Sequence, residues 1–254
     1  MLLKYFDIAA TAVALFTPRM RFIRQTSLPG WSILAKWGAA YPKSVVVVCG
    51  LLGFSLSGAL GWMKGIPVPE VHDEFCYLLA GDTFAHGRLT NPAHPCWEHF
   101  EALHMLQQPT YMAKYPPGQG IALAIGQWLA NEPIVGVWLS IGLASAAIAW
   151  MLQAWLPPPW AVLGALCATM RLAGCSWSNN YWGGAVAAAG GALLLGAVRR
   201  LADRPDWRSA TILGIGLGIL ANSRPFEGAV ISLLSAVILL VAWRRSGLIR
   251  YVST

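Results

Sequence analysis

The chain has 254 residues, of which 56% are hydrophobic and only 11% are charged. Soluble domains carry about 25% charged residues, so this chain lacks the polar groups to cover a surface in water. Its net charge of +7 comes from basic residues in short clusters between apolar runs, which is typical of cytoplasmic loops and not of a nucleic-acid-binding surface. The composition excludes a soluble enzyme and, with the long apolar runs, predicts an all-α integral membrane protein.

Residues 1–43 precede the first long apolar run and hold six basic groups against one acid. The short apolar run 5–17 is faintly like a signal peptide, but Thr17-Pro18-Arg19 is a poor cleavage site. We therefore expect a retained cytoplasmic segment with an amphipathic or interfacial start.

Six later runs approach the length of roughly 20 apolar residues that a membrane-crossing helix needs. They are residues 44–63, 134–156, 159–175, 182–198, 208–222 and 226–243. Lys and Arg are enriched in cytoplasmic loops, and basic residues cluster in 1–43, in the connection 199–208 and in the tail 244–254. This pattern predicts a multi-pass protein of the cell inner membrane whose loop 64–117 faces the periplasm.

Segment 118–130 is also apolar, but counting the crossings argues against a span there. An outer loop 64–117 and a cytoplasmic Arg199 require an odd number of crossings between them, and the intervening sequence offers four apolar segments. Segment 118–130 is the weakest, because it would extend roughly 20 Å as a helix, less than the hydrocarbon core of about 30 Å. We predict a juxtamembrane or re-entrant helix, which puts residues 176–181 and 223–227 on the same outer face as the loop.

The predicted outer loop contains six of the chain's eleven acids and all five histidines. Asp73 stands where a helix N-cap would be and Gly87 is a good terminator, so we expect a short helix over about 74–86. Asp73 could simply cap that helix. Alternatively, Asp73 or Glu74 is a general base, with one carboxylate accepting a proton while its neighbour binds or orients.

Lys114 precedes a Pro-Pro-Gly sequence that suits the first turn of a helix. Free N–H groups at a helix start and a nearby lysine form a favourable anion site, and phosphate is the obvious ligand beside a membrane. The alternative is a lysine that only snorkels to the interface.

Later segments on the predicted outer face add further candidates. Asn180 and Tyr181, in CSWSNNYWGGA, either stack on and hydrogen-bond a sugar or belong to an interfacial aromatic belt. Arg224 and Glu227 lie between two apolar helices, where they contact a substrate or pair with each other. Arg171, near the outer end of its helix, is a further cation candidate.

The loop also contains side chains that metals bind. These are His86, His94, His99, His104, Cys76 and Cys96. No pair has the tight HxxxH or CxxC spacing, and we expect no bound metal. Cys76 and Cys96 could form a disulfide in an oxidising compartment, although two unpaired thiols fit the sequence equally well.

Two stretches of the loop, HDEFCYLLAGDTFAHGRLTNP and PTYMAKYPPGQG, resemble the first extracytoplasmic loop of the GT-C membrane glycosyltransferases. NNYWGGA and SRPFEG are also similar to the branch that contains dolichyl-phosphate-mannose protein mannosyltransferases and aminoarabinose lipid A transferases. The resemblance covers about residues 44–243 and implies a GT-C-like membrane module. Family members are usually longer, with a C-terminal module that helps select substrates, so the resemblance implies that this chain is the N-terminal part of such an enzyme.

The resemblance also implies a reaction and roles for particular residues. The family transfers a sugar with inversion from a polyprenyl-phosphate donor on the periplasmic or lumenal side. Its motif assigns the catalytic base to Asp73 and the lipid phosphate to Lys114, with Arg224 as a further basic residue. Some relatives have a glutamate where this chain has Ala113, and Glu74 is the available substitute. We expect no cofactor, because the lipid-linked sugar is the donor substrate.

The prediction is therefore a glycosyltransferase that moves a sugar from a polyprenyl-phosphate donor to an unknown acceptor on the periplasmic face. The alternative is a non-catalytic membrane protein that binds polyprenyl phosphate, or an inactive fragment of such an enzyme. A transporter fits less well, because the acids lie in a loop and not at the midplane of the spans. The expected partners are membrane lipid, donor and acceptor, without nucleic acid.

Overall fold

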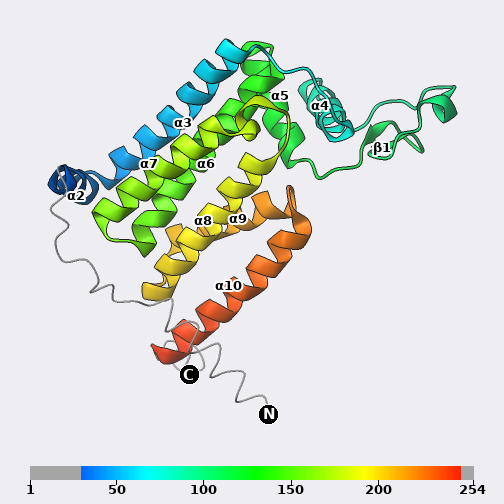
Figure 1. Ribbon diagram of the computed structural model, residues 1–254. Helices are drawn as coiled ribbons and strands as arrows, with labels where there is room; N and C mark the ends of the chain where they lie inside the picture. Colours follow the sequence, from blue (N-terminus) through cyan, green and yellow to red (C-terminus); the bar gives the residue numbers. More distant parts are fainter. Residues whose placement is uncertain (1–29, 247–254) are drawn as a thin grey trace.

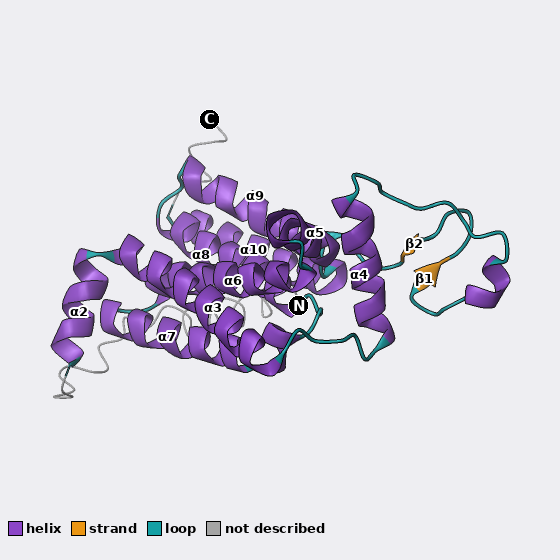
Figure 2. Cartoon of the chain, turned by 90° about the horizontal axis from the view of Figure 1, so that it is seen from above, coloured by secondary structure: helices purple, strands orange, loops and turns teal. Residues whose placement is uncertain are grey.

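The computed structural model describes residues 30–246, which are dominated by helices (Figures 1 and 2). The helices are α2 (Trp31–Ala40), α3 (Pro42–Lys64), α4 (His72–Ala85), α5 (Gly118–Ala130), α6 (Pro133–Trp155), α7 (Pro158–Gly174), α8 (Gly184–Asp203), α9 (Trp207–Ala221) and α10 (Pro225–Arg245). The connections contain the 3-10 helices η1 (Trp97–Phe100) and η2 (Ser176–Asn179) and the antiparallel strands β1 (Met105–Leu106) and β2 (Met112–Ala113). The predicted interfacial start and most of the predicted tail lie outside the described residues.

Within residues 30–246, four helices are long and apolar enough to cross a membrane: α3, α6, α8 and α10. This confirms the prediction of a helical membrane protein. The other two predicted spans are also helices, but α7 has 17 residues and α9 has 15. At roughly 26 and 23 Å, both are shorter than a hydrocarbon core of about 30 Å, so length and composition define four spans.

Proline marks the start of several helices. Pro42, Pro133, Pro158 and Pro225 occupy the first turns of α3, α6, α7 and α10. Proline has no N–H to donate and its φ is already helical, so it suits this position. At the start of α9 the side chain of Asp206 accepts a hydrogen bond from the N–H of Ser209 at 3.0 Å, which caps the helix.

Helices α3 and α6 pack antiparallel through small residues. Gly53 lies against Ser145, where a Cβ on the glycine would come within 2.6 Å of the serine Oγ. Further along, Gly61 lies against the ring of Trp138. Small residues let helix backbones approach closely in a membrane, where van der Waals contact contributes most of the association. The order of these contacts places the end of α3 beside the start of α6.

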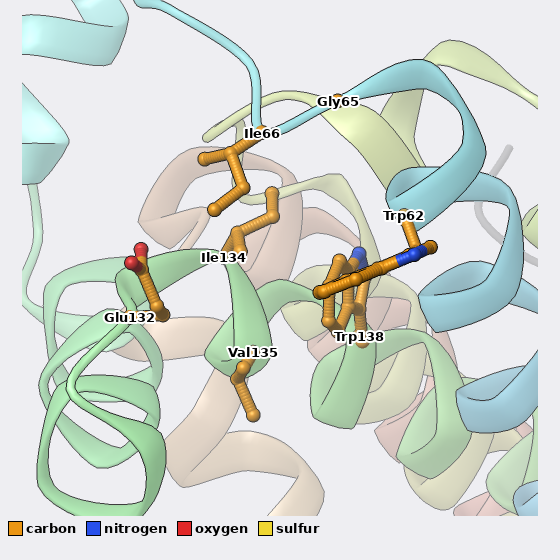
Figure 3. Close-up of a pocket in the computed structure, with 7 residues that line it drawn as sticks. All are labelled: Trp62, Gly65, Ile66, Glu132, Ile134, Val135 and Trp138. Atoms are coloured by element: carbon orange, nitrogen blue, oxygen red, sulfur yellow. The ribbon is translucent and has the colours of Figure 1, made fainter.

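An apolar pocket of about 330 Å³ lies where these two ends meet. Trp62 and Ile66 line it from the end of α3 and the connection after it, and Ile134 and Trp138 line it from α6 (Figure 3). The chain therefore leaves α3 and enters α6 at the same end of the bundle. Helix α5 lies between these two points in the sequence and has the predicted bounds, as expected of a helix that does not cross.

Helix α5 is fixed on α6 by backbone contact. A Cβ on Gly136 would overlap the carbonyl oxygen of Ala122, and a Cβ on Gly126 would overlap the backbone nitrogen of Gly136. Asn131 makes the turn between the two helices in a left-handed conformation with a φ of +57°, which asparagine tolerates better than most residues. The two helices consequently form one hairpin.

Helix α4 packs against α5 and carries the first predicted site residues. Of the two alternatives for Asp73, the helix cap is wrong, because Val71 occupies the N-cap position and Asp73 lies inside the first turn. The Asp73 side chain bonds to Tyr115 and not to the N–H groups of its own helix, so a tertiary contact replaces the local cap. Beyond α4, the connection with β1 and β2 projects away from the bundle (Figure 2).

We predict that Gly136→Ala lowers the thermal unfolding midpoint, because its Cβ has no room against Ala122 and overpacking costs about 1–3 kcal/mol. The control is Gly191→Ala, at a position in α8 where a Cβ meets nothing within 4 Å. It should leave the midpoint unchanged or slightly raised, since alanine favours a helix over glycine. Fluorescence-detected unfolding of the purified protein in detergent measures both. Equal midpoints for the two variants would contradict the close α5–α6 contact.

Candidate functional site

Asp73 and Glu74 are neighbours in the first turn of α4, but their side chains diverge because successive helical residues are about 100° apart. Glu74 is only 5% exposed. Its Oε1 accepts a hydrogen bond from the N–H of Tyr181 at 3.1 Å, and its Oε2 accepts one from the N–H of Glu70 at 3.0 Å. Glu74 thus joins two segments of the chain and does not stand beside Asp73 as a second free carboxylate.

Tyr181 and Gln119 complete this junction. The Nε2 of Gln119 donates to the carbonyl of Tyr181 at 2.9 Å, and the Tyr181 hydroxyl donates to the carbonyl of Pro67 at 3.0 Å. Burial raises the pKa of the Tyr181 phenol, and the charges of Glu132 and Glu74 raise it further, so the hydroxyl remains a donor. Because Tyr181 is only 5% exposed, its ring lies within the junction and offers little surface for a sugar.

Asp73 lies against the segment that leads into α5. Its Oδ1 accepts a hydrogen bond from the Tyr115 hydroxyl at 2.7 Å and lies 3.3 Å from Nε2 of His104. The Nδ1 of the same imidazole is 3.0 Å from the Tyr115 hydroxyl oxygen, so the three side chains form a closed triangle. Asp73 is 44% exposed, and across residues 30–246 its Oδ2 has no hydrogen-bond partner.

The other two members of this triangle are held from several sides. The ring of Tyr115 stacks on Tyr77 of α4, with 5.0 Å between ring centroids. The carbonyl of His104 accepts hydrogen bonds from Sγ of Cys76 at 2.8 Å and from the N–H of Lys114 at 3.1 Å. Burial raises the pKa of the Tyr115 phenol, helped by its hydrogen bond to the carboxylate, and burial also raises the pKa of the Cys76 thiol. Both groups therefore keep the protons that they donate.

The sequence does not assign Tyr115, His104 or Cys76 to a site with Asp73. Tyr115 directly follows Lys114 in the KYPPGQG motif, which was the available signal for it. His104 is one of five histidines, and Cys76 one of five cysteines. No spacing distinguishes either from the others.

Lys114 is exposed, and α5 begins four residues later at Gly118. None of the ion pairs found in residues 30–246 involves Lys114. The N–H of Gly118 already donates to the carbonyl of Asn222 at 2.6 Å, so this helix start is less open to an anion than the sequence predicts. The lysine is available to an anion, and the Gly118–Asn222 bond brings the turn between α9 and α10 against the start of α5.

Arg224 lies at that turn. Its Nη1 is 4.0 Å from Oε1 of Glu227, and the two side chains are 53% and 65% exposed. One of the two alternatives from the sequence was that these residues pair with each other, and they do. An exposed pair at this distance contributes little stability. Burial raises the pKa of the Tyr77 phenol, and the positive charge of Arg224 opposes that rise. Arg224 therefore lies within electrostatic reach of the ring that stacks on Tyr115.

The remaining predicted site residues lie at the edge of this cluster or outside it. Oδ1 of the half-buried Asn180 accepts a hydrogen bond from the N–H of Trp182 at 3.1 Å. Arg171 is exposed in the last turn of α7, which packs against α2, α3 and α6. The described structure thus places Asp73 against Tyr115, the residue after Lys114, and Arg224 within electrostatic reach of Tyr77, and Arg171 makes neither contact.

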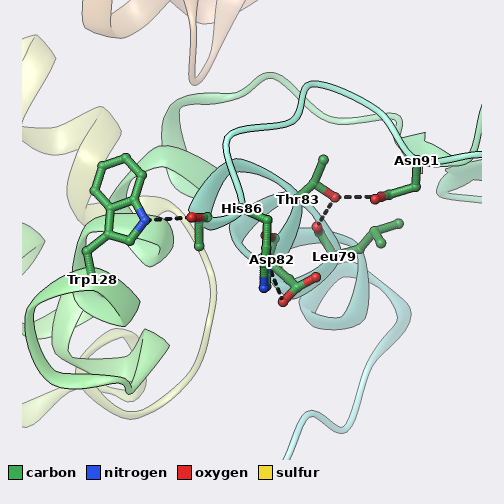
Figure 4. A network of polar contacts seen from close by, with 7 residues as sticks. Leu79, Asp82, Thr83, His86, Asn91 and Trp128 are labelled. Atoms are coloured by element: carbon green, nitrogen blue, oxygen red, sulfur yellow. Dashed lines mark hydrogen bonds and ion pairs between the residues drawn. The ribbon is translucent and has the colours of Figure 1, made fainter.

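The far end of α4 is tied to α5 and to the projecting connection (Figure 4). Nε1 of Trp128 donates to the carbonyl of Ala85 at 2.7 Å, and Nδ2 of Asn91 donates to Oγ1 of Thr83 at 2.7 Å. These bonds fix the direction in which the connection leaves α4. Both ends of the helix that carries Asp73 are therefore anchored.

All five cysteines are free, with Cys76 buried and Cys96 exposed, so the suggested disulfide is not formed. Within residues 30–246, no group of three or more His, Cys, Asp or Glu side chains could hold a metal ion. Two of the histidines make local contacts instead. Nδ1 of His94 accepts a hydrogen bond from the N–H of Cys96 at 3.1 Å, and Nδ1 of His86 lies 3.4 Å from Oδ1 of Asp82 (Figure 4).

Comparison of the chain with protein-family models, with curated proteins and with solved structures finds no match. The motifs of the loop and the geometry around Asp73 are therefore the features that point to a function.

We predict that Glu74→Ala destabilises the protein by about 1–3 kcal/mol, because the N–H groups of Tyr181 and Glu70 lose their acceptor. The control is Glu98→Ala, an exposed position in η1, where a surface substitution should change stability by less than about 0.5 kcal/mol. Unfolding in mixed micelles of increasing SDS content, followed by tryptophan fluorescence, compares the two. Equal stability of both variants would contradict the role given to Glu74.

Proposed function

We propose that this chain is a membrane glycosyltransferase of the GT-C type, which moves a sugar from a polyprenyl-phosphate donor to an acceptor on the periplasmic face. One observation carries the proposal: Asp73, with Oδ2 unpaired in the described part of the chain, bonds to Tyr115, the residue that directly follows the exposed Lys114. Tyr115 in turn stacks on Tyr77, whose phenol is influenced by the charge of the exposed Arg224. A carboxylate to accept a proton and two cations to hold a phosphate are the groups that this transfer needs. The resemblance of the loop motifs supports the same assignment.

In the proposed reaction, the acceptor's hydroxyl or amine gives its proton to Oδ2 of Asp73, and its electron pair forms a bond to the anomeric carbon. The bond from that carbon to the lipid phosphate breaks on the opposite face, with inversion, and its electron pair leaves with the phosphate. Lys114 and Arg224 stabilise the negative charge that the phosphate gains. The donor is an activated sugar, so the reaction uses no cofactor.

The other predicted site residues take different parts in this proposal. Glu74 and Tyr181 hold α4 in place, since their polar groups are bonded to the backbone or to each other. In this proposal Asn180 and Glu227 would contact the acceptor. Arg171 has no part in the transfer.

The proposal includes a membrane arrangement with six crossings, of which α7 and α9 are two. Short helices are accommodated in a bilayer by local thinning. The basic connection 199–208 would lie in the cytoplasm of a protein in the inner membrane. The links from α3 to α6, from α7 to α8 and from α9 to α10 would then share the periplasmic face, along which α5 would lie.

A second candidate is a membrane protein that binds polyprenyl phosphate without transferring a sugar. It is favoured by the burial of Glu74, whose two oxygens are both engaged, so that Asp73 has no second free carboxylate beside it. Both candidates need Lys114 and Arg224, and the glycosyltransferase alone needs Asp73.

We predict that Asp73→Asn lowers sugar transfer by a factor of about 10²–10⁴, because an amide cannot take up the acceptor's proton. Binding of polyprenyl phosphate should be unchanged, since both cations remain. The assay measures free polyprenyl phosphate released from polyprenyl-phosphate-linked sugars by the full chain in native membrane lipids. The control is Asp82→Asn, a carboxylate on the same helix that pairs with His86, which should transfer normally.

Full transfer by the Asp73→Asn variant would show that Asp73 is not the base. Binding without transfer by the unmodified protein would instead favour the second candidate.

We predict that Asn131→Cys reacts with a membrane-impermeant maleimide from the periplasmic side and Pro157→Cys only from the cytoplasmic side. Position 131 is the turn between α5 and α6, and position 157 precedes α7. The accessible thiols Cys96, Cys167 and Cys175 are replaced by serine for this labelling, and a chain that retains Cys96 is the periplasmic control. Labelling of position 131 from the cytoplasm alone would mean that α5 crosses the membrane.

A further inference from the structure

His104 is held more firmly than a surface loop residue needs to be. Its carbonyl accepts two hydrogen bonds, from Cys76 of α4 and from the backbone of Lys114. Its ring stacks on that of Tyr115 at an angle of 24°, with 5.3 Å between centroids, and both ring nitrogens contact polar atoms. The backbone and the ring of His104 are therefore both fixed beside Asp73.

The chemistry of these groups determines where their protons lie. A carboxylate only accepts, so the Tyr115 hydroxyl gives its one proton to Oδ1 of Asp73, 2.7 Å away. The Tyr115 oxygen then accepts, and the group that faces it, Nδ1 of His104 at 3.0 Å, is the donor. Nε2 of the same ring is 3.3 Å from Oδ1. This contact is an ion-pair distance and not a hydrogen bond, so both hydrogen bonds of the triangle are satisfied when the ring carries a proton on Nδ1.

We propose that His104 is a positioning residue for Asp73, which orients the Tyr115 hydroxyl and through it fixes Oδ1, leaving Oδ2 directed to the acceptor. The inference rests on the proposed function, because it assigns a further part of the same site. The chain of hydrogen bonds from Nδ1 through Tyr115 to Oδ1 restricts rotation of the carboxyl group, and a reacting group held in one orientation loses less entropy in the transition state.

His86 provides a matched comparison within the same loop. It also faces an aspartate, Asp82, one turn earlier on the same helix, at 3.4 Å. That pair is local and more than half exposed on both sides, and in residues 30–246 no tyrosine joins it. The contact of His104 with Asp73 spans 31 positions of the chain and depends on the fold.

The first test observes the ring protons in the full chain, labelled with ¹⁵N at histidine, at pH 6 and low temperature. Ring N–H protons exchange rapidly with water unless they are hydrogen-bonded. We expect one protected N–H signal, from Nδ1, that disappears in His104→Gln and is also lost in Tyr115→Phe. Absence of this signal, or its persistence in Tyr115→Phe, would overturn the proposal.

The second test measures turnover with a panel of polyprenyl-phosphate-linked sugars. His104→Gln should lower kcat by a factor of about 10–100 and leave KM for the lipid donor unchanged, because the cations are not altered. His86→Gln should change neither. An unchanged kcat in His104→Gln, or an equal loss in both variants, would contradict the positioning role. If the unmodified protein transfers no sugar, the proposed function fails, and the ring-proton signal still decides how His104 holds Asp73.

Discussion

The carboxylate of Glu74 accepts hydrogen bonds from backbone N–H groups on two sides, Glu70 ahead of α4 and Tyr181 after η2. A buried charge is stable only when donors surround it, so this contact fixes how the loop helix meets the bundle. Gln119 brings the start of α5 to the same point through the carbonyl of Tyr181. Three segments that are far apart in the sequence therefore meet around Glu74 and Tyr181, and the direction of Asp73, the neighbour of Glu74 on the helix, follows from that anchor.

The two adjacent acids thus have different roles, because successive residues of a helix point in different directions. Glu74 faces the bundle, where both of its oxygens are bonded, while Asp73 faces the connection and has one oxygen free within the described residues. Lys114 and Arg224 are both exposed. Like Asp73, and unlike the buried Glu74, they are therefore accessible to a ligand. Polar groups that hold the fold lie inside the junction, and those suited to a ligand lie on its surface.

The helices could be read from the sequence because lipid requires each spanning segment to satisfy its own backbone hydrogen bonds. The run expected at 44–63 is α3, and the helix expected at 118–130 has those bounds. The partners of Asp73 could not be found in this way. They depend on the pairing of β1 with β2, in which Met105 faces Ala113, and this register brings His104 beside Lys114. Strands of two residues have no periodic pattern, so no local signal revealed the contact of Asp73 with Tyr115 and His104. Because the Asp73 side chain makes this contact, it does not cap its own helix.

The backbone contact between Gly136 and Ala122 has a mechanical consequence. Helices so close cannot slide past one another, so α5 and the turn that carries Lys114 keep their place on α6. Arg224 belongs to the turn between α9 and α10, which the Gly118–Asn222 hydrogen bond joins to the start of α5. Helix α9 also packs on α8, and α8 packs on α6. The two cations of the proposed phosphate site are therefore carried by separate helix hairpins whose relative position is set by helix packing inside the bundle.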